Sequence, residues 1–326
     1  LSPFGIPTLP DDHSAVTAGT AALMIHPGAL GDVVLAFSAL ERLSHRFEAV
    51  DLLCQEQIGK AATRLQMVRR ALPIESGRFA DLYGGFSPWL SSWIAGYDQV
   101  VLFSVTSTLA DRLERHAGCP VVRIPPRPGK NRRLHTADHL LAHLARNGLA
   151  DPARSAVCRD LRSPEAEPTR VLIHPGAGSP KKRWPAEHFF ELAQRLAAAG
   201  LDPQFILGPA ERDLAPAVKK RPWPLFATER LVDLLERLLR AGALVGNDSG
   251  VSHLGAYAGL PTVAVFGPTD PAVWSPRGRA VAVVSSRKSA SGPATPEASP
   301  PPVSAVFESL AGLLSGPGNA ASGTRR

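Results

Sequence analysis

Cysteine and aromatic residues are scarce in this sequence, and long apolar runs are missing. The chain has 326 residues, of which 3 are cysteine and 6% are aromatic. Cys54, Cys119 and Cys158 lie far apart and form no metal-ligand pair, which is typical of a reducing compartment rather than of a disulfide framework. No stretch approaches the roughly 20 apolar residues that a membrane-spanning helix needs, and the first residues do not resemble a secretory signal. We therefore expect a cytoplasmic protein.

Two common nucleotide-binding motifs are also missing. The sequence contains no Gly-x-Gly-x-x-Gly and no Gly-x-x-x-x-Gly-Lys-Ser/Thr, which disfavours a dinucleotide-dependent dehydrogenase and a P-loop kinase. The net charge is +7, and it is spread along the chain. Basic residues do not alternate with aromatic ones and there is no zinc-finger pattern, so no nucleic-acid partner is expected. A general attraction for anionic partners follows from the charge.

Short apolar runs alternate with amphipathic segments, which predicts a parallel sheet covered by helices on both faces. The alternation is clearest in the second half of the chain. The predicted strands are 21–25, 50–54, 99–103, 171–173, 204–208, 243–246 and 262–267, and the predicted helices are 33–43, 137–146, 185–199, 231–240, 251–258 and 303–314.

A repeated string suggests that the chain contains two domains. The sequence Ile-His-Pro-Gly-Ala occurs at 25–29 and again at 173–177, each time after an apolar run. A polar, proline-containing stretch at 162–168 lies between the copies and is typical of a linker. We expect an extension at 1–20, domains at 21–165 and 166–284, and a Pro/Ser/Ala-rich tail at 285–326 with a helix at 303–314.

Three glycine-containing turns follow predicted strands, at 28–32, 176–184 and 246–250. In open α/β sheets, ligands bind beyond the carboxyl ends of the strands. Backbone amides and helix N-termini at such turns hold anions. The turns therefore indicate a binding cleft for an anionic ligand, without identifying it.

A series of motifs in fixed order resembles the family 9 glycosyltransferases, the bacterial lipopolysaccharide heptosyltransferases. The resemblance covers about residues 21–280 and implies the GT-B fold, in which an N-terminal Rossmann-like domain holds the acceptor and a C-terminal one holds the donor. It also implies a last helix that crosses back to the first domain. The matching segments are Gly28-Ala29-Leu30-Gly31-Asp32-Val33-Val34, His174-Pro175-Gly176-Ala177-Gly178, Lys182-Arg183-Trp184-Pro185, Gly208-Pro209-Ala210-Glu211, Gly246-Asn247-Asp248-Ser249-Gly250-Val251-Ser252-His253-Leu254 and Phe266-Gly267-Pro268-Thr269-Asp270-Pro271.

Asp32 matches the aspartate that the family is thought to use as general base. Displacement at an anomeric carbon requires that the acceptor hydroxyl lose its proton as the new bond forms, and a carboxylate in the cleft can take that proton. The alternative is that Asp32 caps the helix that follows.

The resemblance assigns the donor to the C-terminal half. Lys182 matches a lysine that contacts the donor phosphates, and it acts as a second catalytic residue by compensating charge on the leaving diphosphate. Glu211 matches a ribose-binding glutamate and Asp248 an aspartate beside the donor sugar. The alternatives are a solvated basic loop, a solvated carboxylate and a helix cap. The predicted donor-binding residues are Gly176, Ser179, Lys182, Glu211, Asp248, Ser249, Gly250 and Thr269.

Basic residues gather between the last predicted strand of the first domain and the helix at 137–146. They lie in the acceptor half, and the acceptors of the family are anionic glycolipids, but the cluster is also compatible with a solvated loop. The predicted acceptor-binding residues are Arg127, Lys130, Arg132 and Arg133.

These observations predict an inverting glycosyltransferase without a metal or other cofactor. The resemblance implies transfer of heptose or a related sugar from an ADP-sugar to a lipopolysaccharide core-type glycolipid, with peripheral contact at the inner face of the membrane. Two alternatives stay open. One is another nucleotide-sugar enzyme, either a hexosyltransferase or an epimerase. The other is a non-catalytic module that binds a nucleotide-sugar or a glycan.

Overall fold

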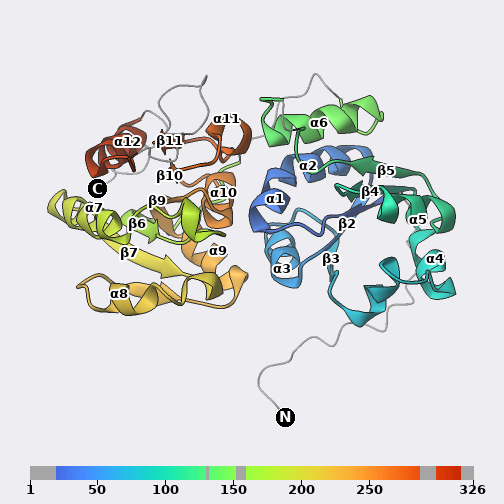
Figure 1. Ribbon diagram of the computed structural model, residues 1–326, viewed down its shortest axis with the longest axis horizontal. Helices are drawn as coiled ribbons and strands as arrows, with labels where there is room; N and C mark the ends of the chain where they lie inside the picture. Colours follow the sequence, from blue (N-terminus) through green and yellow to red (C-terminus); the bar gives the residue numbers. More distant parts are fainter. Residues whose placement is uncertain (1–19, 130–131, 152–158, 287–298, 317–326) are drawn as a thin grey trace, which may run out of the picture.

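A computed structural model describes residues 20–129, 132–151, 159–286 and 299–316, which form two parallel sheets, each covered by helices (Figure 1). The strands of the first sheet lie in the order β3-β2-β1-β4-β5. Most of the predicted extension at 1–20 and much of the predicted tail lie outside the described residues. The elements of the first half are β1 (Ala21–Ile25), α1 (Leu30–Leu35), α2 (Phe37–Arg46), β2 (Ala49–Cys54), α3 (Glu56–Arg64), β3 (Arg70–Pro73), η1 (Gly77–Leu82), α4 (Pro88–Ile94), β4 (Gln99–Phe103), α5 (Thr108–His116), β5 (Val121–Ile124) and α6 (Thr136–Arg146).

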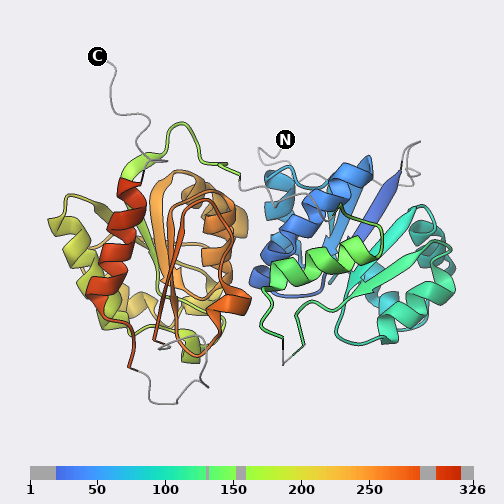
Figure 2. The ribbon, with the colours of Figure 1, turned by 90° about the horizontal axis from the view of Figure 1, so that it is seen from above.

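The second sheet has the strand order β11-β10-β9-β6-β7-β8 and is also parallel. Figure 2 shows the two halves side by side, with α12 lying along the outer part of the second half. The elements of the second half are β6 (Glu167–His174), η2 (Pro180–Lys182), α7 (Ala186–Ala198), β7 (Asp202–Leu207), η3 (Pro209–Glu211), α8 (Ala215–Lys219), β8 (Leu225–Ala227), α9 (Leu231–Leu239), β9 (Ala241–Asn247), α10 (Gly250–Tyr257), β10 (Thr262–Phe266), α11 (Pro271–Trp274), β11 (Val281–Ser285) and α12 (Val303–Ser315).

The central strands are apolar along their whole length because both faces of each sheet are covered. Every residue of β1 is buried, and Met24 pairs with Leu52 on one side and Val101 on the other. In the second sheet, β9 and β10 are equally buried. Continuous rather than alternating apolar strands are what a helix-covered parallel sheet requires. This fold confirms the predicted α/β class with two Rossmann-like halves.

The structure departs from the predicted elements at a few places. The predicted helix over 33–43 is two helices, since the chain turns at Ala36, whose N–H donates to the carbonyls of Asp32 and Val33. The strands β3, β5, β8 and β11 had not been predicted. Each of them is short or only half-buried, so its sequence lacks the unbroken apolar run that marks the central strands.

The last helix, α12, belongs to the second half. Val306 and Leu310 are fully buried in a core with Phe189 of α7 and Val263 and Val265 of β10. The expectation that this helix crosses back to the first half is therefore wrong. The helix instead covers the face of the second sheet beside α7 (Figure 2).

The two halves meet at the N-termini of α1 and α10. A side chain at Gly31 would begin 3.3 Å from the His253 ring, and one at Gly250 would begin 2.8 Å from the Leu30 side chain. Glycine at both positions therefore allows the two helix ends to approach closely. Each helix end follows the carboxyl end of a central strand, so the contact brings the ligand-binding edges of the two sheets together.

Polar contacts around this point also connect the halves. Tyr257 donates to Glu41 at 2.8 Å, and Arg64 pairs with Glu236 at 2.5 Å. His135, just before α6, lies 2.9 Å from the carbonyl of Ser275 through Nε2. These contacts come from α2, α3 and the segment before α6, so the halves are joined at several points besides the α1–α10 contact.

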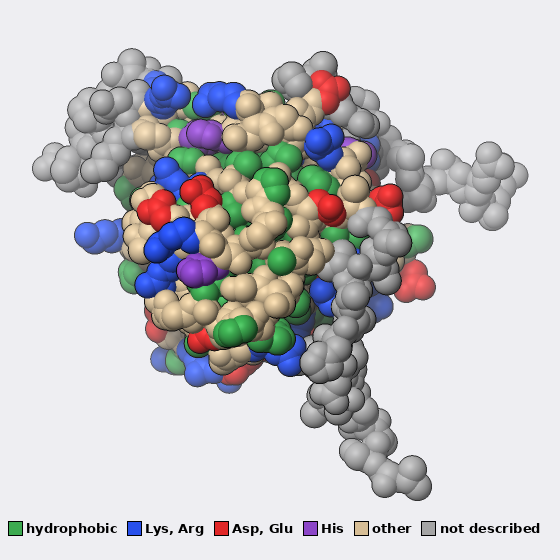
Figure 3. Space-filling model, turned by 90° about the vertical axis from the view of Figure 1, so that its right-hand side faces the viewer, with side chains coloured by type: hydrophobic (Ala, Val, Ile, Leu, Met, Phe, Trp, Pro, Cys, Tyr) green, Lys and Arg blue, Asp and Glu red, His purple; other side chains and the backbone are tan. Residues whose placement is uncertain are grey.

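The end of the first half that lies away from the second half is shown in Figure 3, where hydrophobic, basic and acidic side chains are interspersed. In the part of the chain that the structure describes, every helix is too short or too polar to cross a membrane.

We predict that Gly242→Ala destabilises the second half. A methyl group there would begin 2.0 Å from the Pro168 carbonyl oxygen, which is backbone of the neighbouring strand β6. The strands must separate locally, and we expect a loss of about 2–4 kcal/mol in the free energy of unfolding, measured by urea titration. The control is Gly312→Ala in α12, where no atom lies within 4 Å and helix propensity favours alanine by about 0.5–1 kcal/mol. Equal stability of the Gly242→Ala variant and the wild type would contradict the proposed strand contact.

Candidate functional site

Asp32 lies in a pocket of the first half, at the carboxyl edge of the sheet. Helix α1 begins at Leu30 and its N-cap is Ala29, so Asp32 is in the first turn and is not the capping residue. The pocket encloses about 250 Å³. It is lined by His26, Pro27, Gly28, Asp32, Phe103, Ser104, Val105, Pro126 and Arg127.

The surroundings of Asp32 raise the pKa of its carboxyl. Burial raises the pKa of its carboxyl above the ordinary value, and the negative charge of Asp248 raises it further. The positive charges of Arg127 and Lys182 and the Ala29 backbone lower the pKa, but their effect is smaller than that of burial. Lys182 and Asp248 belong to the second half, which meets the first half at α1, the helix that carries Asp32. A raised pKa makes a carboxylate a better proton acceptor near neutral pH.

Asp248 is the centre of the polar contacts in the second half. It follows β9 and is only 4% exposed. Its Oδ2 accepts hydrogen bonds from Lys182 Nζ at 2.8 Å and from Thr269 Oγ1 at 2.6 Å. The helix-cap alternative is wrong for Asp248, because the N-cap of α10 is Ser249, whose Oγ accepts from the Ser252 N–H. The contact joins three predicted donor-binding residues from three segments.

His253 faces the same carboxylate from α10. Its Nε2 lies 3.9 Å from Asp248 Oδ1. Burial lowers the pKa of its imidazole to about 4, and the negative charge of Asp248 opposes that shift. The ring is therefore neutral at pH 7 and packs beneath Gly31 of the first half.

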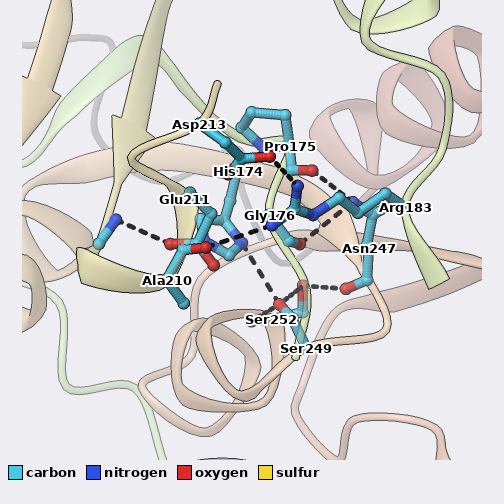
Figure 4. A network of polar contacts seen from close by, with 11 residues as sticks. His174, Pro175, Gly176, Arg183, Ala210, Glu211, Asp213, Asn247, Ser249 and Ser252 are labelled. Carbon is cyan, nitrogen blue, oxygen red and sulfur yellow. Dashed lines mark hydrogen bonds and ion pairs between the residues drawn. The ribbon is translucent and has the colours of Figure 1, made fainter. Parts of the chain in front are cut away.

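Glu211 forms a second centre, shown in Figure 4. Its Oε2 accepts from the Gly208 N–H at 2.9 Å and lies 3.7 Å from His174 Nε2. Burial favours the neutral carboxyl, but the nearby His174 ring together with the Gly208 N–H outweighs it, so the pKa of Glu211 is lowered. Gly176 lies directly beside it, since a side chain at Gly176 would begin 2.1 Å from the Glu211 Cγ.

Sequence reasoning missed two residues that hold this site together. Asn247 accepts from the Trp184 N–H at 2.8 Å and donates to the carbonyls of Pro175 and Gly176, which ties the lysine loop to the first turn. His174 contacts Ser249 Oγ through Nδ1 at 3.3 Å and so lies between Ser249 and Glu211 (Figure 4). Both residues lie inside the matching motifs, close to the predicted donor-binding residues Gly176 and Asp248.

Other predicted donor residues have supporting positions in this structure. Ser249 is buried and its hydroxyl is used within α10 and by His174. Gly250 lies against Leu30 of α1. Ser179 is the N-cap of η2, and its carbonyl accepts from the Lys182 N–H at 3.0 Å. Trp184 is buried and donates through Nε1 to the Pro301 carbonyl, as expected of a packing residue.

The predicted acceptor residues are not brought together as one group. Arg127 lines the pocket with Asp32. Arg133 instead pairs with Asp270 of the second half at 3.3 Å, and Arg132 lies near the His139 and His143 rings of α6. Lys130 lies outside the described residues.

Comparison with known proteins places this arrangement in context. Residues 141–299 match the profile of glycosyltransferase family 9 (heptosyltransferase). The second half of the chain is thus similar to the family 9 glycosyltransferases. The profile match lies mainly in the half that carries Lys182, Glu211 and Asp248, and it does not include Asp32.

Individual relatives extend the comparison of this family 9-like protein. It is 30% identical over 134 residues to lipopolysaccharide heptosyltransferase 2 of Salmonella typhimurium, a match that covers 38% of each chain. The sequence match thus spans little more than a third of that relative. The similarity to solved structures covers a larger part of the chain. The family 9 glycosyltransferase of Veillonella parvula and the Escherichia coli ADP-heptose lipopolysaccharide heptosyltransferase II each superpose with a TM-score of 0.71 at 20% identity. Both cover 90% of this chain, and 97% and 98% of their own chains. They confirm the GT-B fold across both halves.

We predict that Lys182 and Asp248 are energetically coupled in the ligand-free protein. Lys182→Ala removes one of the two hydrogen-bond donors to the buried Asp248 carboxylate and should cost about 1–3 kcal/mol in the free energy of unfolding. In the double variant with Asp248→Asn the charge is gone, so the two losses should fall short of additivity by at least about 1 kcal/mol. Lys181→Ala, at the exposed neighbouring position, is the control. Strictly additive losses would contradict the coupling.

Proposed function

We propose that the protein is an inverting glycosyltransferase that moves heptose, or a related sugar, from an ADP-sugar to a hydroxyl of an anionic, lipopolysaccharide core-type glycolipid. One observation carries the proposal. A carboxylate of raised pKa in one half faces the Lys182–Asp248 ion pair in the other. The family 9 profile covers the half with the ion pair, and the similarity in fold covers both halves. The Escherichia coli and Salmonella relatives are named as lipopolysaccharide heptosyltransferases, which supports the choice of sugar and acceptor.

Asp32 is the base in this mechanism. The acceptor hydroxyl enters the pocket beside Asp32, and its oxygen attacks the anomeric carbon from the side opposite the diphosphate. The bond from that carbon to the diphosphate oxygen breaks, and ADP leaves with the electron pair. The hydroxyl proton passes to the Asp32 carboxylate. A single displacement inverts the anomeric configuration.

Lys182 compensates the charge that develops on the leaving diphosphate. In the ligand-free protein its ammonium group is held by Asp248 at 2.8 Å, so it is already placed at the edge of the cleft. When the donor binds, its phosphate oxygens compete with Asp248 for this cation, and a fixed ammonium group near a developing negative charge lowers the barrier. We propose that the reaction needs no metal and that chelation by EDTA leaves the rate unchanged.

Glu211 and Asp248 orient the donor. A carboxylate such as Glu211, held in its charged form by His174 and the Gly208 N–H, accepts hydrogen bonds from neighbouring hydroxyls of a ribose. Asp248 is placed to do the same for the sugar. Arg127, which lines the Asp32 pocket, supplies a positive charge for an anionic acceptor. We propose that the enzyme meets this acceptor peripherally, at the cytoplasmic face of the membrane.

We predict that Asp32→Asn abolishes most of the transfer while donor binding persists. Removal of a general base lowers turnover by about 10²- to 10⁴-fold. The measurement is release of ADP and UDP from a panel of nucleotide-sugars in the presence of a core glycolipid acceptor. ADP should appear from ADP-heptose with the wild type only.

The matched control is Asp111→Asn, an exposed aspartate in the first turn of α5, which should turn over like the wild type. Full activity of Asp32→Asn would remove Asp32 from the mechanism. Binding of ADP-heptose without turnover by the wild type, with every acceptor tried, would favour the binding-module alternative. Conversion of a nucleotide-sugar without an acceptor would favour an epimerase.

We predict that Gly176→Ala weakens ADP binding by displacing Glu211. The new methyl group would lie 2.1 Å from the Glu211 Cγ, so the carboxylate must leave its position beside His174. Loss of a charged hydrogen-bond acceptor to the ribose lowers affinity by about 10- to 100-fold, which calorimetry can measure. Gly178→Ala is the control, because a side chain there would meet no atom within 4 Å apart from its neighbours in the chain. Equal ADP affinity in the Gly176→Ala variant and the wild type would show that Glu211 does not contact the nucleotide.

A further inference from the structure

We propose that His26 is a positioning residue for Asp32, acting through the Gly28–Ala29 peptide. The inference rests on the proposed function, since it concerns the base of that reaction. His26 directly follows β1, lines the pocket and is only 1% exposed. Both His26 and Asp32 line the pocket that also contains Arg127.

The hydrogen bonds of the turn connect the two residues. The N–H of Gly28 donates to His26 Nδ1 at 3.1 Å. The next backbone amide, that of Ala29, favours the charged form of Asp32 and so lowers the pKa of its carboxyl. Gly28 itself lies against Asp32, since a side chain there would begin 3.2 Å from the Asp32 Cβ. Because the two amides are consecutive, the bond to His26 limits how the peptide between them can turn. The imidazole therefore orients the donor that stabilises the charged form of the base.

Packing holds the imidazole in this position. Its ring stacks on Phe103 with centroids 4.9 Å apart and an angle of 24° between the planes. Gly28 lies over the ring, because a side chain there would begin 2.6 Å from His26 Cε1 and 3.2 Å from the Asp32 Cβ. Glycine at this position lets the ring, the turn and the aspartate pack against each other without an intervening side chain.

The contacts also determine which nitrogen carries the proton. Nδ1 accepts a hydrogen bond, so a neutral imidazole must carry its proton on Nε2. Burial lowers the pKa of His26 to about 4, so the ring is neutral at neutral pH. Nε2 is buried and has no hydrogen-bond partner among the described residues. A buried donor without a partner is unfavourable for stability, so packing alone would favour a phenylalanine here.

The direction of the effect on catalysis follows from the charges around Asp32. The groups that act on it are Arg127 after β5, Lys182 in η2, Asp248 after β9 and the Ala29 N–H of its own turn. Loss of the His26 acceptor weakens only the last of these. The carboxylate then loses a stabilising donor, its pKa rises, and a higher pH is needed to keep the base deprotonated.

Two substitutions separate the positioning role from packing. His26→Phe keeps the ring on Phe103 but removes the acceptor, whereas His26→Asn places Oδ1 where Nδ1 stood and keeps an acceptor for the Gly28 N–H. We expect His26→Phe to melt at or above the wild-type temperature, with an unchanged KM for the donor. The acid limb of its kcat/KM profile should move up by about one pH unit, which lowers activity about tenfold on the acid side of the profile. His26→Asn should keep the wild-type limb.

Several outcomes would overturn the proposal. One is a wild-type acid limb in His26→Phe. Another is loss of activity in both variants in parallel with a lower melting temperature, which would mark a structural role. A third is an ¹⁵N spectrum of the His26 ring that shows the proton on Nδ1.

A direct titration keeps this inference separate from the proposed function. The Asp32 carboxyl can be followed by ¹³C NMR in the wild type and both His26 variants, with Asp32→Asn used to assign its signal. If the wild type transfers no sugar, the proposed function fails. The positioning role still stands if the carboxyl pKa is higher in His26→Phe than in the wild type and His26→Asn, and it falls if the three values agree.

Discussion

The close approach of α1 and α10 is the contact on which the candidate site depends. Gly31 and Gly250 let two helix N-termini meet, one from each sheet. Without that approach Asp32 would lie at the edge of one domain and the Lys182–Asp248 pair at the edge of another, each open to solvent. With it, the charges of the second half reach Asp32, where Lys182 lowers the pKa of its carboxyl and Asp248 raises it. Neither glycine carries a functional group. Both affect the candidate site because they allow the helices α1 and α10 to lie close together.

Much of the architecture could be predicted because the central strands are apolar along their whole length. Strands such as β1 and β10 are buried on both faces, so their composition alone marks them. Edge strands such as β3 and β8 lack this signal, since half-buried positions accept polar residues. The packing of α12 could not be predicted either. Its sequence indicates an amphipathic helix but not which sheet its apolar face covers.

The sequence indicated some of the residues that gather in the second half, but not the contacts they make. The motif order identified Lys182, Asp248 and Thr269, and the structure joins these three. Side chains that hold other side chains, such as Asn247 and His174, gave no signal of their own, because their role depends on segments more than 60 positions away. Arg127 and Arg133 look equivalent in the sequence, yet one lines the pocket and the other pairs with Asp270.

The Lys182–Asp248 pair also bears on how a reaction cycle of the proposed kind would end. A cation that must attract a diphosphate strongly would also retain the product strongly. Here the departing ADP would leave behind a lysine that pairs again with a buried carboxylate 2.8 Å away, so the charge of this lysine would remain compensated. Asp248 competes with the donor phosphates for Lys182 when the donor binds, and it would compete with ADP in the same way after the reaction. The ion pair would thus weaken the binding of the product and favour its rapid release.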